Sequence, residues 1–209
     1  MGDEPVRASG TIEGRGQLAT ARRYAALGGV VGVAGFVGAW VVCGSLRVGY
    51  DPVHDAISQL AASDTQHRRW MTAGFVVFGV GVAVYSWALR GALRGPSWAA
   101  ALVTALATLG VAAAPLGSLD TAHHVAALTG YVALAATPLL AAPALQAGGR
   151  ARAARASVVC GVLTACLLTA SILDPWHGAT QRAGLLVTDV WIVVTAVTMW
   201  RRGRLVPAA

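Results

Sequence analysis

The chain is poor in charged residues and has no lysine. Only 12% of its 209 residues are charged, against about a quarter in an average soluble domain. This shortage, together with 56% hydrophobic residues, excludes an ordinary water-soluble domain. All 16 basic residues are arginines. They lie in short clusters between apolar runs and not on one soluble face, so the net charge of +7 does not indicate nucleic-acid binding.

Cysteine is also scarce. Cys43, Cys160 and Cys166 lie inside apolar segments and form no CxxC pair, which excludes a disulfide framework and predicts small buried side chains. A cleavable signal peptide is not predicted, because the polar stretch 1–23 precedes the first apolar run. We therefore expect the first apolar segment to stay in the membrane.

Long apolar segments are what the chain has in abundance. Six of them follow one another, at 24–46, 69–90, 96–115, 121–146, 155–173 and 180–200. Each is close to the roughly 20 residues that a helix needs to cross the hydrocarbon core, and Trp and Tyr mark their edges as in an aromatic belt. The sequence predicts an all-α polytopic integral membrane protein, a six-transmembrane-helix bundle over 24–202. A disordered cytoplasmic tail at 1–23 would precede it and a cytoplasmic tail at 203–209 would follow.

The arginines predict an orientation. In this topology twelve of the sixteen lie on the side of the two termini. The other four are Arg47, Arg68, Arg69 and Arg182. Because short cytoplasmic loops carry the excess of basic residues, both termini are expected in the cytoplasm and the protein in the plasma membrane.

Most other ionisable residues fall on the opposite, outer side. They are His54, His67, His123, His124, His177, Asp51, Asp55, Asp64, Asp120 and Asp174. This one-sided clustering fits a functional polar mouth. It also fits loops from which arginine is excluded and which other polar residues fill. Both interpretations stay open.

The longest outer connection predicts a short amphipathic helix. Asp51 suits the N-cap and Pro52 the first helical position. Val53, Ile57 and Leu60 would form an apolar stripe at helical spacing. Candidate substrate-binding residues on this segment are Asp51, His54, Ser58 and Gln59. The helix would lie flat at the membrane interface or form a lid over the bundle.

The fourth apolar segment opens with an aspartate followed by two histidines. Asp120 precedes His123 and His124 by three and four residues, so its carboxylate could orient a histidine as a metal ligand or as a base. His123, His124 and His177 are the candidate ligands of a divalent metal, although their spacing is not that of a zinc motif. A bis-histidine haem would need His124 and His177 at equal depth. A purely structural N-cap remains the alternative.

The last segment contains a carboxylate in its middle. Asp189 lies two turns after Arg182 on the same helical face. A charged residue at the centre of the bilayer costs roughly 2.5–3.5 kcal/mol on insertion scales. Asp189 is therefore expected to face protein or water, in a structural or a functional role.

One motif resembles a known family. Tyr50-Asp51-Pro52, followed by Asp55-Ala56-Ile57-Ser58-Gln59-Leu60-Ala61, is similar to the signature of an uncharacterised bacterial and archaeal membrane family, domain of unknown function 998. The further matching positions are Asp120, His124, Gly178, Gln181, Arg182 and Trp191. The resemblance covers about 24–202 and implies an all-helical multispan protein without an established activity.

The first functional hypothesis is a membrane-embedded enzyme that acts on a lipid or isoprenoid substrate. Besides the metal version, a protonated aspartate could act as general acid while aromatic rings shelter a developing positive charge. The candidate catalytic residues are Asp55, Asp120, His124 and Asp189. Further candidate substrate-binding residues are Tyr131, Trp176, Arg182 and Trp191.

Two other classes of function remain open. A small-molecule transporter or binding protein would use Arg182 and Asp189 along a path through the bundle. A non-catalytic accessory subunit would dock on a helix partner, or on a second copy of itself, through a stripe of small residues on the first helix. The stripe consists of Gly28, Gly32, Gly35 and Gly38.

Overall fold

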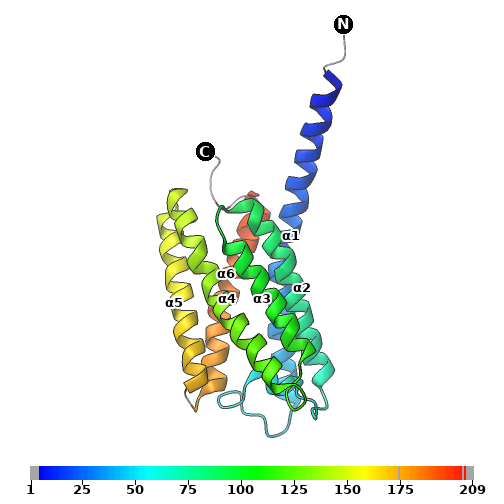
Figure 1. Cartoon of the computed structure of the whole chain (residues 1–209), viewed down its shortest axis with the longest axis vertical. Helices are drawn as coiled ribbons and strands as arrows, with labels where there is room; N and C mark the ends of the chain where they lie inside the picture. The colour runs from blue at the N-terminus through cyan, green and yellow to red at the C-terminus, as the bar shows by residue number, and fades with distance from the viewer. Residues whose placement is uncertain (1–4, 174, 204, 206–209) are drawn as a thin grey trace.

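The computed structural model describes residues 5–173, 175–203 and 205, of which 5–13 and 15 are described by their backbone only. Within this part of the chain six α-helices form one bundle (Figure 1). They are α1 (Pro5–Leu46), α2 (Arg68–Ala92), α3 (Ser97–Ala113), α4 (Asp120–Ala147), α5 (Ala151–Leu173) and α6 (His177–Arg202). A short 3₁₀ helix, η1 (Ile57–Ala61), lies in the connection between α1 and α2.

The helices are arranged as a closed ring. Each helix packs on the next one in the chain, and α6 also packs on α1. The connections α1–α2, α3–α4 and α5–α6 meet at one end, which we call the mouth end, and α6 finishes at the opposite end (Figure 1). Five helices are long and apolar enough to cross a membrane. α3 has 17 residues, or about 25 Å at 1.5 Å per residue, which is at the short limit for a span.

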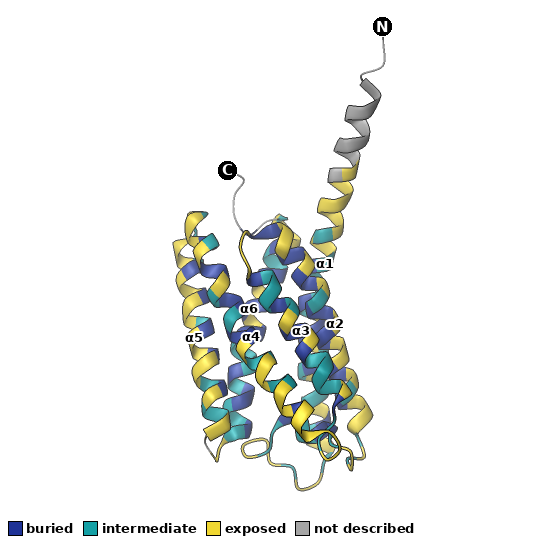
Figure 2. Cartoon of the chain, viewed as in Figure 1, coloured by how far each residue is buried: buried dark blue, intermediate teal, exposed yellow. Residues whose placement is uncertain are grey.

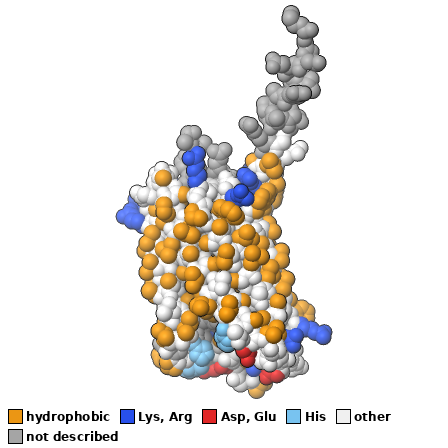
Figure 3. Space-filling view, viewed as in Figure 1, with side chains coloured by type: hydrophobic (Ala, Val, Ile, Leu, Met, Phe, Trp, Pro, Cys, Tyr) orange, Lys and Arg blue, Asp and Glu red, His pale blue; other side chains and the backbone are white. Residues whose placement is uncertain are grey.

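The surface of the bundle is apolar around its waist. Exposed residues follow the outward sides of the helices, while buried ones face the interior (Figure 2). Large apolar side chains among the exposed ones include Val80, Leu106, Val132, Leu163 and Val194. The charged side chains and histidines gather at the two ends (Figure 3). A surface of this kind is stable only in a lipid environment, so the predicted multi-pass membrane architecture is confirmed.

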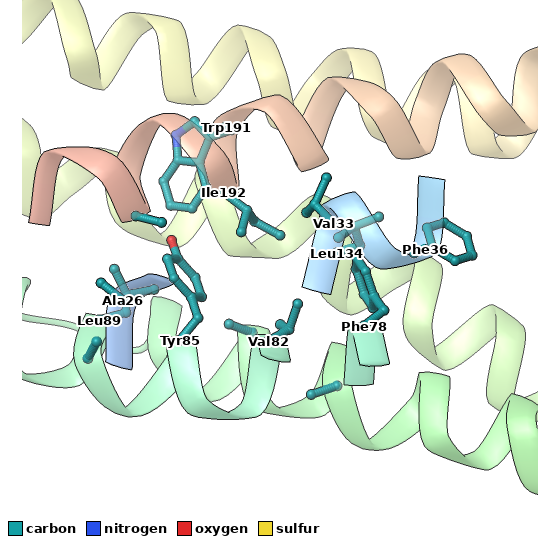
Figure 4. Close-up of a cluster of buried hydrophobic side chains, with 14 of the residues drawn as sticks. Ala26, Val33, Phe36, Phe78, Val82, Tyr85, Leu89, Leu134, Trp191 and Ile192 are labelled. Carbon is teal, nitrogen blue, oxygen red and sulfur yellow. The ribbon is translucent and has the colours of Figure 1, made fainter. Parts of the chain in front are cut away.

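The core is built on close approach of α1 and α2. A Cβ at Gly28 would lie 2.6 Å from the carbonyl oxygen of Gly81, and one at Gly81 would lie 2.5 Å from that of Gly28. Further along, the Phe36 ring makes tilted contacts with Phe75 and Phe78, with ring centroids 5.5 and 5.3 Å away. Phe36 and Phe78 are labelled in Figure 4. Three of the four stripe glycines, Gly28, Gly32 and Gly35, therefore pack against α2 inside the bundle. The last one, Gly38, faces open space.

Polar side chains also join helices inside the bundle. The hydroxyls of Tyr85 and Thr195 are 2.7 Å apart and link α2 to α6. Trp191 Nε1 donates to Ser157 Oγ at 2.8 Å and links α6 to α5. Such bonds replace polar groups that would otherwise face hydrocarbon.

The N-terminal segment differs from the sequence prediction. Residues 1–23 were expected to be disordered, whereas α1 begins at Pro5 and continues into the bundle without a break. Proline is well suited to a first helical turn, and the Gln, Leu, Ala and Arg residues before Tyr24 are good helix formers. Gln17 and Leu18 are exposed, and this part of α1 projects beyond the bundle (Figures 1 and 2). Of the predicted tail 203–209 the structure describes Gly203 and Leu205, and Leu205 is buried.

Candidate functional site

The outer connection folds over the mouth end, and it is not one amphipathic helix. Residues before η1 form turns: Asp51 Oδ1 accepts from the Val53 N–H and Asp55 Oδ2 accepts from the Asp51 N–H, both at 2.8 Å. Regular helix begins only at Ile57, as a 3₁₀ turn. The predicted short outer helix is present as η1, but it begins at Ile57 and not at Asp51, because short acidic side chains that bind nearby backbone N–H groups favour turns. Ile57 and Leu60 are buried as expected, whereas Val53 is exposed.

Arg182 fixes this connection to α6. Its side chain is buried, and Nη1 donates to the carbonyl oxygens of Pro52 at 2.7 Å, Asp55 at 3.0 Å and Gly178 at 2.8 Å. Nη2 donates to the Tyr50 hydroxyl, and the guanidinium lies 5.3 Å from the ring centroid of Trp40. We call this arrangement the Arg182 clasp. A guanidinium has its donors in a rigid fork, which suits several fixed carbonyls at once.

Neighbouring residues of α6 complete the clasp. Gln181 Oε1 accepts from the Ile57 N–H at 2.9 Å, and its Nε2 donates to the Tyr131 hydroxyl. The Ala179 N–H donates to the Val53 carbonyl at 2.9 Å. A Cβ at Gly178 would lie 2.5 Å from the Asp55 carbonyl oxygen. Only glycine lets the backbones approach this closely.

Tyr50 is the clasp residue contributed by the outer connection itself. Burial raises the pKa of its phenol above the ordinary value, and the adjacent Arg182 guanidinium opposes this only in part. The hydroxyl therefore keeps its proton and donates toward the Ala56 carbonyl oxygen at 3.2 Å.

Beside the clasp lies a cleft with a volume of about 380 Å³. Three of the five histidines line it, and we call it the histidine cleft. Its polar lining consists of Ser58, His123, His124, Tyr131, Ser171, His177 and Gln181. The sequence predicted these histidines on one side of the membrane, and the fold brings His123, His124 and His177 to one cleft.

Two of these histidines have a defined tautomer. His123 Nδ1 lies 2.7 Å from the Ala114 carbonyl oxygen, and His124 Nδ1 lies 2.7 Å from that of Asp120. A carbonyl oxygen can only accept, so each Nδ1 must carry the hydrogen. In the neutral ring each Nε2 then has a free lone pair, as a general base requires.

The histidine cleft continues in two directions. Inward, it shares Ser58, His123, Tyr131 and Gln181 with an interior cavity of about 70 Å³ among the phenylalanines of the core. Sideways, it shares Leu128, Tyr131 and Ile172 with a groove of about 320 Å³ between α4 and α5. We call the second space the lateral groove. Tyr131 lines all three spaces.

A family model described as "Protein of unknown function (DUF998)" matches residues 30–198. The chain belongs to the DUF998 family. No curated protein and no solved structure matches it. The matched range contains the Arg182 clasp, the histidine cleft and the lateral groove. The signature residues that suggested the family thus have a visible role in this member, since Tyr50, Gly178, Gln181 and Arg182 hold the outer connection in place.

The four candidate catalytic residues of this DUF998 protein do not form one site, although Asp120 and His124 share a turn of α4. His124 lines the histidine cleft. Asp55 accepts from the Asp51 N–H, and Asp120 Oδ1 accepts from the Gly117 N–H at 2.7 Å, so both carboxylates order turns. Asp189 is buried in α6, and neither of its oxygens has a hydrogen-bond partner among the described residues.

Among the candidate substrate-binding residues, Ser58 and Tyr131 line the cleft. Asp51 and His54 instead pair with each other at 2.7 Å on the exposed turn, and this hydrogen bond holds the pKa of Asp51 below its usual value.

The other candidate binding residues lie outside the cleft. The backbone oxygen of Gln59 accepts from Arg47, Arg182 belongs to the clasp and Trp191 belongs to the core. Trp176 is exposed just before α6. Asp174 lies outside the described residues.

The histidines do not form a metal centre in the described part of the chain. No group of three His, Cys, Asp or Glu side chains there is placed to hold one metal ion. His123 and His124 share the cleft with His177, and their Nδ1 bonds to backbone carbonyls leave Nε2 of each ring free. The geometry of the described residues therefore gives no support to a metal site with three protein ligands.

Sequence reasoning missed the importance of two residues. Gln181 connects the clasp to the cleft through its two polar atoms, and Gly178 allows the clasp to close. Both were noticed only as parts of the family signature. A glycine three residues before a Gln-Arg pair at a helix start could have suggested close backbone approach.

Proposed function

We propose that this protein is a membrane-embedded enzyme that binds a lipid by its aliphatic chain and acts on the polar end of that lipid in the histidine cleft. The supporting observation is the continuity between the polar cleft and the apolar lateral groove. Val132 and Ile172 in the groove are 64% and 61% exposed on the outside of the bundle. A lipid could therefore enter sideways from the bilayer without crossing water.

The cleft, and not the groove, would decide which lipid binds. Lipid tails are as apolar as leucine side chains, so moving a chain from the bilayer into the groove changes its hydrophobic free energy little. Selectivity then depends on polar contacts at the end of the chain. Those contacts are available from Ser58, His124, Tyr131 and Gln181.

The chemistry proposed for the cleft is acid–base catalysis. His124 Nε2 has the free lone pair needed to take a proton from a hydroxyl group or a water molecule. The Tyr131 hydroxyl accepts from Gln181, so its own hydrogen can be donated to an oxygen that becomes negative during the reaction. The imidazole and the phenol line the same cleft.

The expected orientation of the protein in the membrane indicates which leaflet would supply the lipid. Arginines are concentrated at the end opposite the mouth, as expected for a cytoplasmic side. The histidine cleft would then face the extracytoplasmic side of the plasma membrane, with both termini in the cytoplasm. The lipid would come from the outer leaflet.

Lipid binding can be tested by native mass spectrometry of the protein extracted in mild detergent. Ala165 is exposed and lines the lateral groove, whereas Ala34 is exposed on α1. Ala165→Trp would fill the groove and should remove a co-purifying lipid that the wild type retains. The matched control Ala34→Trp should keep it. Equal lipid retention in both variants would contradict binding in the groove.

The enzymatic step can be tested separately by comparing cellular lipids. Cells that express the wild type should contain less of one lipid class and more of its product than cells that express His124→Phe. His54→Phe serves as the control because His54 lies on the exposed turn outside the cleft. Identical lipid profiles for the wild type and His124→Phe would refute the catalytic role and leave lipid binding intact.

A further inference from the structure

We infer that the polar end of the bound lipid is an uncharged hydroxyl group and not a phosphate. This inference rests on the proposed function, since it names the class of lipid that the histidine cleft would accept. It follows from the charges around the cleft and from the hydrogen-bonding capacity of its lining.

Among the described residues, no arginine, aspartate or glutamate lines the cleft. Of the four arginines at the mouth end, Arg182 is buried in the clasp, and Arg47 and Arg68 donate to the carbonyl oxygens of Gln59 and Ser63. The fourth, Arg69, is exposed and does not line the cleft. Phosphate groups are normally bound by arginine, by lysine or by free N–H groups at a helix start. In the first turn of α6 the Ala179 N–H is already bonded to Val53. A phosphate would therefore enter the cleft without a cation beside it.

The side chains that do line the cleft match a hydroxyl group. In their neutral form His123 and His124 each offer an acceptor at Nε2, because Nδ1 of each carries the hydrogen. Tyr131 offers a hydroxyl hydrogen, since its oxygen already accepts from Gln181. A hydroxyl group both donates and accepts one hydrogen bond, so it can use both kinds of partner at once. Phosphate oxygens without hydrogen only accept, so the two neutral imidazoles would offer them no hydrogen bond from Nε2.

The interior cavity leaves room for a small group next to that hydroxyl. Its volume of about 70 Å³ would hold about five water-sized groups at 10–15 Å³ each. Beyond the polar residues that it shares with the cleft, Thr104 and Thr108 line it together with a larger number of apolar side chains, among them Phe36, Phe75 and Phe78, so the space suits a short apolar branch better than a second polar group. The long chain would stay in the lateral groove.

The test compares three probes that share one chain: 1-hexadecanol, hexadecyl phosphate and hexadecane. The full-length protein is stripped of lipid in detergent at about pH 8, above the ordinary imidazole pKa, and binding is measured by native mass spectrometry. Hexadecanol should bind at least ten times more tightly than either of the other two. His124→Phe should weaken hexadecanol binding about three- to tenfold, the value of one or two neutral hydrogen bonds. It should leave hexadecane binding unchanged.

Two control variants keep the result interpretable. His124→Gln retains an acceptor oxygen and should recover part of the hexadecanol affinity, and His54→Phe should behave as the wild type. Tighter binding of hexadecyl phosphate, or equal binding of hexadecanol and hexadecane, would overturn the inference while leaving lipid binding in place. If none of the three probes binds, the proposed function fails, and the inference fails with it.

Discussion

Replacing Gly178 by alanine would show whether the Arg182 clasp keeps the mouth end closed. The new Cβ would lie 2.5 Å from the Asp55 carbonyl oxygen, 2.8 Å from that of Pro52 and 2.9 Å from Arg182 Nη1. Real Cβ atoms do not approach other atoms this closely. Two of the three neighbours are backbone atoms, so no side-chain rotation relieves the contact, and the outer connection must move away from α6.

The expected destabilisation can be built from three contributions. Overpacking of a close contact costs about 1–3 kcal/mol. Displacing the Pro52 and Asp55 carbonyls weakens two hydrogen bonds to a charged donor, each with a net value of about 1.5–3 kcal/mol when fully lost. Alanine recovers up to about 1 kcal/mol of helix propensity relative to glycine. If about half the value of the two bonds is lost, the closed state should lose about 2–5 kcal/mol.

Alkylation of Cys43 measures this opening directly. Cys43 is 2% exposed and belongs to the same buried cluster as Ile57 and Leu60 of η1. With Cys160→Ser and Cys166→Ala removing the other thiols, a maleimide should label the wild type slowly. A loss of 2 kcal/mol or more in the closed state raises the open population by more than about tenfold. Gly178→Ala should accelerate labelling at least by this factor and lower the melting temperature.

Gly38→Ala is the matched control. It is also a helical glycine, but a Cβ there would meet nothing within 4 Å. This variant should be as stable as the wild type or up to about 1 kcal/mol more stable, and its Cys43 should react at the wild-type rate. If Gly178→Ala melts and labels like Gly38→Ala, the outer connection does not depend on the clasp and the reasoning above is refuted.

Three smaller predictions concern single side chains and thermal unfolding in detergent. Asp189→Asn should change stability by no more than about 1 kcal/mol, because its buried oxygens have no hydrogen-bond partner among the described residues; a loss of several kcal/mol would reveal an ion pair. Tyr85→Phe should cost about 1 kcal/mol through the lost bond to Thr195, and an unchanged melting temperature would contradict this bond. The hydrogen bond from His54 lowers the pKa of Asp51 from 3.8, so the advantage of the wild type over Asp51→Asn should be complete above about pH 4 and disappear as the pH falls through the lowered pKa. A difference independent of pH would count against the pair.

The spans could be predicted from the sequence because hydrophobic length is a local property. The segment 121–146 became α4 (Asp120–Ala147), and 69–90 became α2 (Arg68–Ala92). The start of α1 was missed for the opposite reason. Before Tyr24 the chain has helix-forming residues but no hydrophobic length, so a search for apolar runs had nothing to detect.

The outer connection could not be predicted from local pattern. Its apolar residues Val53, Ile57 and Leu60 fit helical spacing, but Asp51 and Asp55 bind nearby N–H groups and Arg182 binds the carbonyls. The bond from Arg182 to Pro52 joins residues 130 positions apart. Nothing in a single sequence shows such a contact.

The histidine cleft could be predicted in part from the sequence. Topology placed all five histidines on one side, yet the selection of His123, His124 and His177 depends on how α4 and α6 are placed around the ring. The pairing of His54 with Asp51 removes that imidazole from the cleft by a local bond. The sequence could place the histidines on one side of the membrane, but it could not show which of them share a cleft or that His123 and His124 each bind a backbone carbonyl through Nδ1.

Gln181 makes the clasp and the cleft parts of one arrangement. Its Oε1 holds the Ile57 N–H at the start of η1, and its Nε2 holds the Tyr131 hydroxyl at the junction of cleft, cavity and groove. The neighbouring Arg182 uses Nη1 and Nη2 for backbone carbonyls and Tyr50, while its buried Nε has no hydrogen-bond partner among the described residues. The hydrogen bonds of this buried arginine therefore fix the outer connection. Gln181 and Arg182 thus hold the outer connection over the mouth end, and the Arg182 guanidinium does not line the cleft. Movement of the outer connection would break the bond between Gln181 and Ile57 and thereby disturb the bond between Gln181 and Tyr131. Opening of the mouth end would then also change the polar contacts that a lipid meets in the cleft.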